Sequence, residues 1–117
     1  MTFRVELGHL PDSRLSPNAR LNRYVLANIK RGAKEQAWIL CKAQGVPTEP
    51  YAKAHITITY VGDNRRRDFD NLLSASKHYL DGIVAAGVIK DDNVFVVSYS
   101  LHYEVGKPNT IIEIEEQ

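Results

Sequence analysis

The alternation of apolar and polar residues along the chain predicts four strands and two helices. Phe3, Val5 and Leu7 alternate with polar neighbours, which is the period-two pattern of a half-buried strand. Residues 55–61 repeat this pattern with β-branched and aromatic side chains, which favour strands. The other periodic stretches predict helices over residues 20–44 and 72–86, and strands over residues 94–104 and 110–115.

Glycine, proline and short polar residues separate these segments. Gly45 and Pro47 end the first helix, and Gly87 ends the second, which we expect to begin at a cap formed by Asp70 or Asn71. The order is therefore β-α-β-α-β-β. We expect an α+β fold with two layers, in which two helices pack on a mixed sheet of about four strands and the last two strands form a C-terminal antiparallel hairpin.

Length and composition limit the class of protein. A chain of 117 residues fits one domain, which we expect to span residues 1–117. No apolar run approaches the roughly 20 residues that a membrane-spanning helix needs, so we expect no membrane partner. Cys41 is the single cysteine, which excludes an internal disulfide and favours a cytoplasmic location.

Charge is divided unevenly along the chain. Residues 1–67 hold 12 lysines and arginines against 5 acidic residues, a net charge of +7, whereas residues 68–117 hold 3 against 9, a net charge of −6. This division suggests a basic surface beside an acidic site. Folding can equally intermix the two halves, so the charge distribution alone does not establish separate basic and acidic surfaces.

Two acidic pairs flank the second predicted helix. In an extended segment Asp68 and Asp70 point the same way, and a hard divalent cation would relieve the repulsion between their carboxylates. Asp91 and Asp92 follow the helix, and the loop after Gly87 must bring them back to Asp68 and Asp70 if the pairs share one ion. The alternative is structural, because aspartate is common at helix caps and in turns.

Basic residues lie close to these acids. Lys77 shares one helical stripe with Asp70 and Asp81, from which its ammonium can reach a bound phosphate or pair with Asp81. The basic residues expected to contact the phosphates of a polyanionic substrate are Arg65, Arg66 and Arg67, extended by Arg20 and Arg23. A solvated charged surface is the alternative.

Taken in order, these residues resemble a known family of crossover-junction endodeoxyribonucleases. The matching positions are Asp68-Phe69-Asp70-Asn71, Lys77-His78-Tyr79-Leu80-Asp81-Gly82, Gly87-Val88-Ile89-Lys90-Asp91-Asp92 and the upstream segment Ser16-Pro17-Asn18-Ala19-Arg20. The pattern is similar to that of the RusA family of Holliday junction resolvases from bacteria and phages. In some members the lysine stands about where Ser74 lies here, close to one helical turn earlier.

The resemblance implies an activity and a set of roles. It implies catalytic roles for Asp68, Asp70, Lys77 and Asp92, of which the three aspartates bind Mg²⁺, with Mn²⁺ as a substitute and Asp91 as the less favoured ligand. It also implies a homodimer that makes paired nicks in a four-way DNA junction. Two alternatives stay open: a nuclease of other branched DNA such as flaps, and a DNA-binding module without catalysis.

Overall fold

The computed structural model describes residues 1–17 and 19–117; Asn18, which belongs to the upstream segment of the resemblance, lies outside the described residues. The elements are β1 (Thr2–Glu6), the short 3₁₀ helix η1 (Ser13–Leu15), α1 (Arg23–Gln44), β2 (Ala54–Gly62), α2 (Phe69–Ala86), β3 (Val97–Val105) and β4 (Asn109–Glu116). The predicted order β-α-β-α-β-β and the α+β class are confirmed. Among the described residues, no helix is long and apolar enough to cross a membrane.

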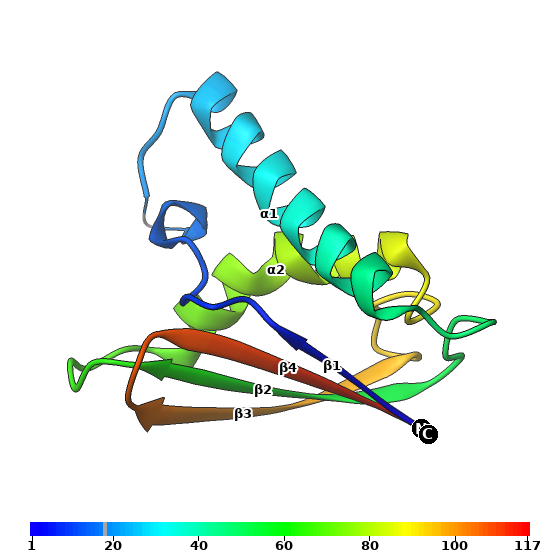
Figure 1. Ribbon diagram of the computed structural model, residues 1–117. Coiled ribbons are helices and arrows are strands. Elements are labelled where there is room, and N and C mark those ends of the chain that lie inside the picture. The colour runs from blue at the N-terminus through cyan, green and yellow to red at the C-terminus, as the bar shows by residue number, and fades with distance from the viewer. Residues whose placement is uncertain (18) are drawn as a thin grey trace.

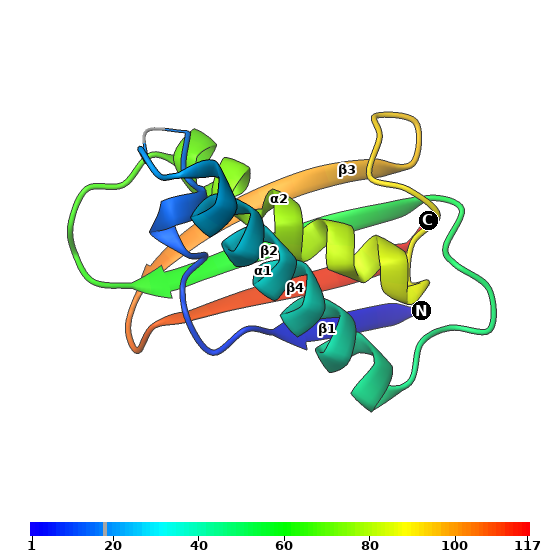
Figure 2. The same cartoon turned by 90° about the horizontal axis from the view of Figure 1, so that it is seen from above.

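The four strands form one mixed sheet in the order β1-β4-β2-β3. Strands β2 and β3 are parallel, whereas β4 is antiparallel to both of its neighbours, β1 and β2. Both helices lie on the same side of the sheet, and α1 crosses over α2 (Figures 1 and 2). The predicted two-layer arrangement of two helices on a four-stranded mixed sheet is therefore confirmed.

The last two strands depart from the prediction in one respect. They follow one another through a short turn and run in opposite directions, but they do not pair, because β2 lies between them. The turn passes over the end of β2, where the Gly106 N–H donates to the Gly62 carbonyl oxygen at 2.8 Å. Strand β2 thus gains two partners and becomes fully buried on its helix-facing side, which a local hairpin would not achieve.

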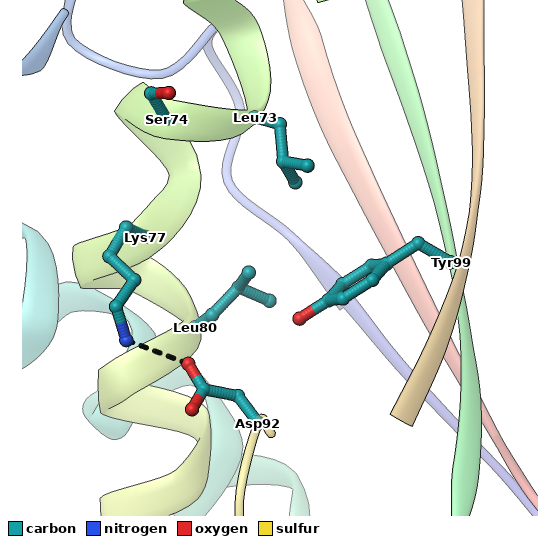
Figure 3. A pocket seen from close by; sticks show the side chains of 6 residues that line it. All are labelled: Leu73, Ser74, Lys77, Leu80, Asp92 and Tyr99. Atoms are coloured by element: carbon teal, nitrogen blue, oxygen red, sulfur yellow. Dashed lines mark hydrogen bonds and ion pairs between the residues drawn. The ribbon is translucent and has the colours of Figure 1, made fainter. Parts of the chain in front are cut away.

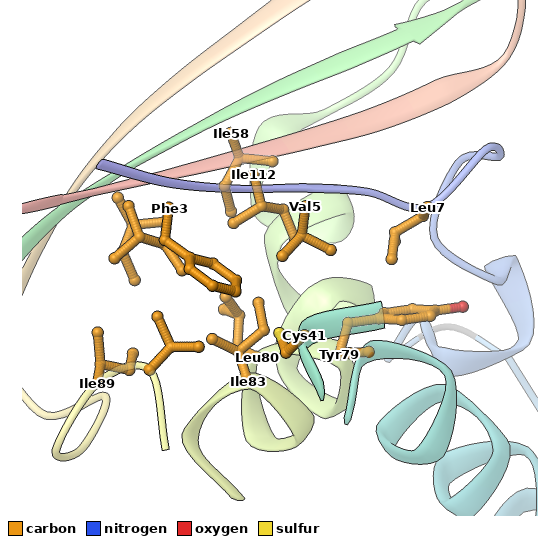
Figure 4. Close-up of a cluster of buried hydrophobic side chains, with 14 of the residues drawn as sticks. Phe3, Val5, Leu7, Cys41, Ile58, Tyr79, Leu80, Ile83, Ile89 and Ile112 are labelled. Carbon is orange, nitrogen blue, oxygen red and sulfur yellow. The ribbon is translucent and has the colours of Figure 1, made fainter. Parts of the chain in front are cut away.

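The core lies between the sheet and the helices (Figure 4). Strands β2 and β4 contribute several side chains that are fully excluded from solvent, among them Ile56, Ile58, Ile112 and Ile114. Helix α1 contributes the small buried residues Ala33, Ala37 and Cys41.

Small side chains on α1 are required because the helices cross closely at Gly82. A β-carbon there would overlap the Lys34 carbonyl oxygen and lie 2.9 Å from the Ala37 β-carbon. The glycine in the Asp81-Gly82 motif thus has a packing role: it allows α1 to sit against α2.

Candidate functional site

The first acidic pair lies at the start of α2, and only Asp68 has the extended backbone that was predicted for both residues. Asp68 is the residue before the helix, and Asp70 already lies in its first turn. Because Asp70 is helical and Asp68 is extended, the pair lacks the continuous strand geometry on which the prediction of parallel side chains rested. The predicted start of the helix at a cap formed by Asp70 or Asn71 was too late, because the helix begins at Phe69.

The second acidic pair returns to the middle of α2. Gly87 adopts a left-handed conformation with φ 95° and ends the helix, as predicted. The chain then binds to Tyr51, whose N–H donates to the Val88 carbonyl oxygen at 2.9 Å and whose carbonyl oxygen accepts from the Lys90 N–H at 3.0 Å. This anchor places the following residue pair, Asp91 and Asp92, beside the helix.

Lys77 makes the contact that joins this loop to α2. Its Nζ donates to Asp92 Oδ2 at 2.8 Å (Figure 3). It also donates to Asp81 Oδ1 at 2.8 Å. The predicted pair with Asp81 one turn away is therefore present, and Lys77 also contacts a carboxylate remote in the chain. Its predicted contact with a bound phosphate stays a prediction. These hydrogen bonds to Asp81 and Asp92 raise the pKa of Lys77, so its side chain stays an ammonium.

A pocket of about 470 Å³ opens between α2 and the sheet at this point. Its lining residues are Leu73, Ser74, Lys77, Leu80, Asp92 and Tyr99. In Figure 3 the Tyr99 ring, from β3, points across the pocket toward α2. Burial, together with the negative charge of Asp92, raises the pKa of Tyr99 to about 12, so this phenol is a neutral donor at physiological pH.

The two members of the second acidic pair have different surroundings. Asp91 accepts from the Asp92 N–H at 2.7 Å and from the Asn93 side-chain amide at 3.0 Å, and these bonds lower the pKa of Asp91. Asp91 thus shapes the turn, as the structural alternative describes. Asp92 instead directs its carboxylate to Lys77 and the pocket.

The three predicted metal ligands do not meet in the described chain. No group of three or more histidine, cysteine, aspartate or glutamate side chains among residues 1–17 and 19–117 could hold a metal ion. Asp92 lies at the level of Lys77, which is about two helical turns, roughly 10 Å, along α2 from Asp70. The loop after Gly87 therefore does not bring Asp92 back to Asp68 and Asp70 as the shared-ion prediction requires.

The predicted DNA-binding arginines occupy two places. Arg65 and Arg67 both bind Asp63, with shortest nitrogen-to-oxygen distances of 2.8 Å and 3.2 Å. Arg66 and Arg67 line a second cleft, of about 280 Å³, which Asp68 also lines.

The other two predicted DNA-binding arginines, Arg20 and Arg23, lie at the N-terminal end of α1. Arg20 precedes α1 and is exposed, and Arg23 begins α1 and stacks over the Tyr24 ring at 5.1 Å. The structure thus groups Arg66 and Arg67 with Asp68, and Lys77 with Asp92, at two separate openings.

Four pocket residues were not predicted as site residues: Leu73, Ser74, Leu80 and Tyr99. Leu73, Leu80 and Tyr99 give the Lys77–Asp92 pocket its apolar wall. The alternation in β3 indicates that Tyr99 faces the same side as Leu101, but only the return of the loop after α2 places it beside Asp92.

The comparison with known proteins identifies no relative. No protein-family model matches the chain, and a comparison with curated proteins finds no significant match. The resemblance to the RusA family therefore rests on the residues quoted for it and stays a prediction.

Proposed function

We propose that the chain is a metal-dependent endodeoxyribonuclease that resolves four-way DNA junctions by paired phosphodiester hydrolysis. The observation that carries the proposal is the contact between Lys77 and Asp92. These residues are 15 positions apart in the sequence, yet Nζ and Oδ2 lie 2.8 Å apart at the mouth of a pocket. Both are residues to which the resemblance gives catalytic roles.

Lys77 is suited to bind a phosphate at this pocket. Its side chain is 53% exposed, and an ammonium has three donors, of which Asp81 and Asp92 each receive one. The remaining donor can bind a phosphate oxygen of the DNA backbone. A cation held there would stabilise the negative charge that develops during phosphodiester hydrolysis.

The metal requirement comes from the resemblance, and the single chain fits it only in part. Mg²⁺ commonly takes one or two carboxylates and completes its shell with water and substrate phosphate oxygens. Asp68, Asp70 and Asp92 remain the candidate ligands for Mg²⁺ or Mn²⁺, but they do not form one three-carboxylate group in the described chain. We therefore assign no step of the hydrolysis to the ion.

The basic residues support DNA as the substrate class. Arg66 and Arg67 line the cleft beside Asp68, where guanidinium groups can contact phosphates on either side of a scissile bond. A junction with two-fold symmetry suits a homodimer, which would place one site on each of two opposed strands.

Cleavage of matched substrates tests the proposal. A synthetic four-way junction, a flap and a linear duplex that share the same sequences are incubated with the protein in Mg²⁺, in Mn²⁺ and in chelator. We expect symmetric paired nicks in the junction with either metal and none in chelator. Absence of metal-dependent cleavage, or faster cleavage of the flap than of the junction, would overturn the proposal.

One observation favours a second candidate function, a DNA-binding module without catalysis. The predicted ligands are separated in the described chain, whereas binding requires only the basic surface and not an assembled metal site. This candidate predicts a junction complex in gel shifts at low salt, with no nicks at any Mg²⁺ or Mn²⁺ concentration.

A further inference from the structure

Strand β3 forms an unusually open edge of the sheet. It has nine residues and contains no proline, lysine or arginine, and within residues 1–17 and 19–117 it pairs on one side only, with β2. The opposite edge strand, β1, is shorter, with five residues that include Arg4 and Glu6. Natural sheets protect their edges with short strands, charges, proline or bulges, because an unpaired edge is a template for another strand.

The backbone groups that face the open edge can be identified. The Ala54 N–H donates to the Val96 carbonyl oxygen at 2.9 Å, and the Gly106 N–H donates to the Gly62 carbonyl oxygen at 2.8 Å. Backbone groups of successive strand residues point to opposite sides, so the even-numbered residues of β3 bind β2. The odd-numbered residues direct their N–H and C=O groups away from the sheet: Val97, Tyr99, Leu101, Tyr103 and Val105.

The sequence of β3 is nearly symmetric about Leu101. It reads Val-Ser-Tyr-Ser-Leu-His-Tyr-Glu-Val, so positions equally distant from Leu101 carry matching or complementary side chains. We propose that β3 pairs with β3 of a second copy of this chain, antiparallel and centred on Leu101, to make one continuous sheet across a two-fold axis.

Each pair in this register is favourable. The odd-numbered residues would form the hydrogen-bonded pairs, with Val97 opposite Val105, Tyr99 opposite Tyr103, and Leu101 opposite itself. The even-numbered residues would form the non-hydrogen-bonded pairs, in which side chains come closest. Those pairs are Ser98 with Glu104 and Ser100 with His102, and each joins a hydroxyl to a possible hydrogen-bond partner.

The second copy would also cover apolar surface that one chain leaves in water. Val105 is 71% exposed, and Tyr99, Leu101 and Tyr103 are only partly buried. A shift of the register by one residue would set odd-numbered apolar residues against even-numbered polar ones, so the pattern favours the two-fold register.

The same pairing places the two Lys77–Asp92 pockets near the two-fold axis. Tyr99 lines the pocket, and Tyr103 of the second copy would lie opposite Tyr99 across the new strand pair. The inference does not rest on the proposed nuclease activity, because its test is the state of association and not cleavage.

Two substitutions at one exposed position test the register. Ser98→Glu sets a carboxylate opposite Glu104 twice in the dimer, whereas Ser98→Lys sets an ammonium there. Ser98 is exposed, and both substitutions remove its hydroxyl from the His55 ring, which lies 2.6 Å away, so each serves as the control for the other. Sedimentation equilibrium of the full chain should show a dimer whose dissociation constant is about tenfold higher for the glutamate variant than for the lysine variant.

Amide hydrogen exchange gives a second measurement that does not depend on a variant. In the proposed dimer the Leu101 and Tyr103 amides are protected at high protein concentration and exchange faster on dilution. The Ser100 amide, which faces β2, stays protected throughout. A chain that remains monomeric, equal dissociation constants for the two Ser98 variants, or rapid exchange of the Leu101 amide in a dimer would each overturn the proposal.

Discussion

Lys77 Nζ lies 2.8 Å from Asp92 Oδ2, and this ion pair joins the middle of α2 to the loop that precedes β3. The Asp92 side chain is only 20% exposed, whereas that of Lys77 is 53% exposed. The carboxylate is therefore held against the protein while the ammonium remains accessible. A ligand that enters the pocket would meet Lys77 first and Asp92 behind it.

Asp92→Asn and Asp91→Asn should have different effects on cleavage of a four-way junction. Asp92 holds the Lys77 ammonium at the pocket, so its loss should lower the single-turnover rate by roughly a hundredfold to a thousandfold, the scale for losing one group that stabilises developing negative charge, here Lys77. Asp91 holds the turn by accepting from the Asp92 N–H, a bond that the asparagine oxygen can still accept, and only the bond from the Asn93 side-chain amide is lost. The cleavage rate of Asp91→Asn should therefore stay close to that of the wild type. Equal losses in the two variants would contradict this division of roles.

Asp70→Asn should remove cleavage in Mg²⁺ while leaving junction binding intact. Asp70 is exposed in the first turn of α2, so the substitution loses a favourable interaction with the helix end worth about 0.3–1 kcal/mol, too little to unfold the domain. Glu35→Gln, at an exposed acid on α1, is the control and should cleave normally. Cleavage rates and gel shifts at one salt concentration measure both effects, and retained cutting by Asp70→Asn would exclude Asp70 from the reaction.

The order of the elements followed from local periodicity, and their pairing did not. The alternation around Ile56 and Ile58 located β2 correctly because side chains on one face of a strand are buried together. A short turn between two strands normally makes a hairpin, yet β2 separates β3 from β4. Which strands pair depends on the burial of the whole sheet, to which residues far apart in the chain contribute. No local sequence pattern indicates this pairing.

For the candidate site, too, the sequence predicted the local contacts but not the tertiary ones. The stripe of Lys77 and Asp81 on one helix follows from spacing alone, and the structure contains that pair. The position of Asp92 depends on where the chain attaches to Tyr51 after the helix ends, which is a tertiary contact. For that reason the sequence could state that a shared ion requires Asp92 to return to Asp68 and Asp70, but it could not show that Asp92 reaches Lys77 instead.

Alkaline pH should destabilise the fold through two tyrosines. Burial raises the pKa of Tyr60 from 10.0 to about 12, and burial together with the Asp92 charge raises that of Tyr99 to about 12. Above pH 10 the unfolded chain therefore loses phenol protons that the folded chain retains. The contribution of these two neutral tyrosines to the free energy of unfolding is complete below pH 10, and it is lost as the pH rises toward 12.

Tyr99→Phe should accordingly reduce the fall in the free energy of unfolding across this pH range, as measured by urea titration. Tyr24→Phe, at a ring that is 67% exposed, is the control and should follow the wild type. A Tyr99→Phe variant that loses as much stability as the wild type between pH 10 and 12 would show that Tyr99 ionises equally in the two states.

Gly82→Ala should destabilise the domain because α1 and α2 cross at Gly82. The added methyl group would overlap the Lys34 carbonyl oxygen, which is backbone and cannot rotate away, so the helices must separate. Overpacking of this kind costs about 1–3 kcal/mol in the free energy of unfolding. Gly32→Ala is the matched control, because a β-carbon there meets no atom within 4 Å. It should stabilise the helix by roughly 0.5–1 kcal/mol. Urea titration of both variants measures the contrast, and similar effects from the two substitutions would mean that the helices can part at Gly82 without loss.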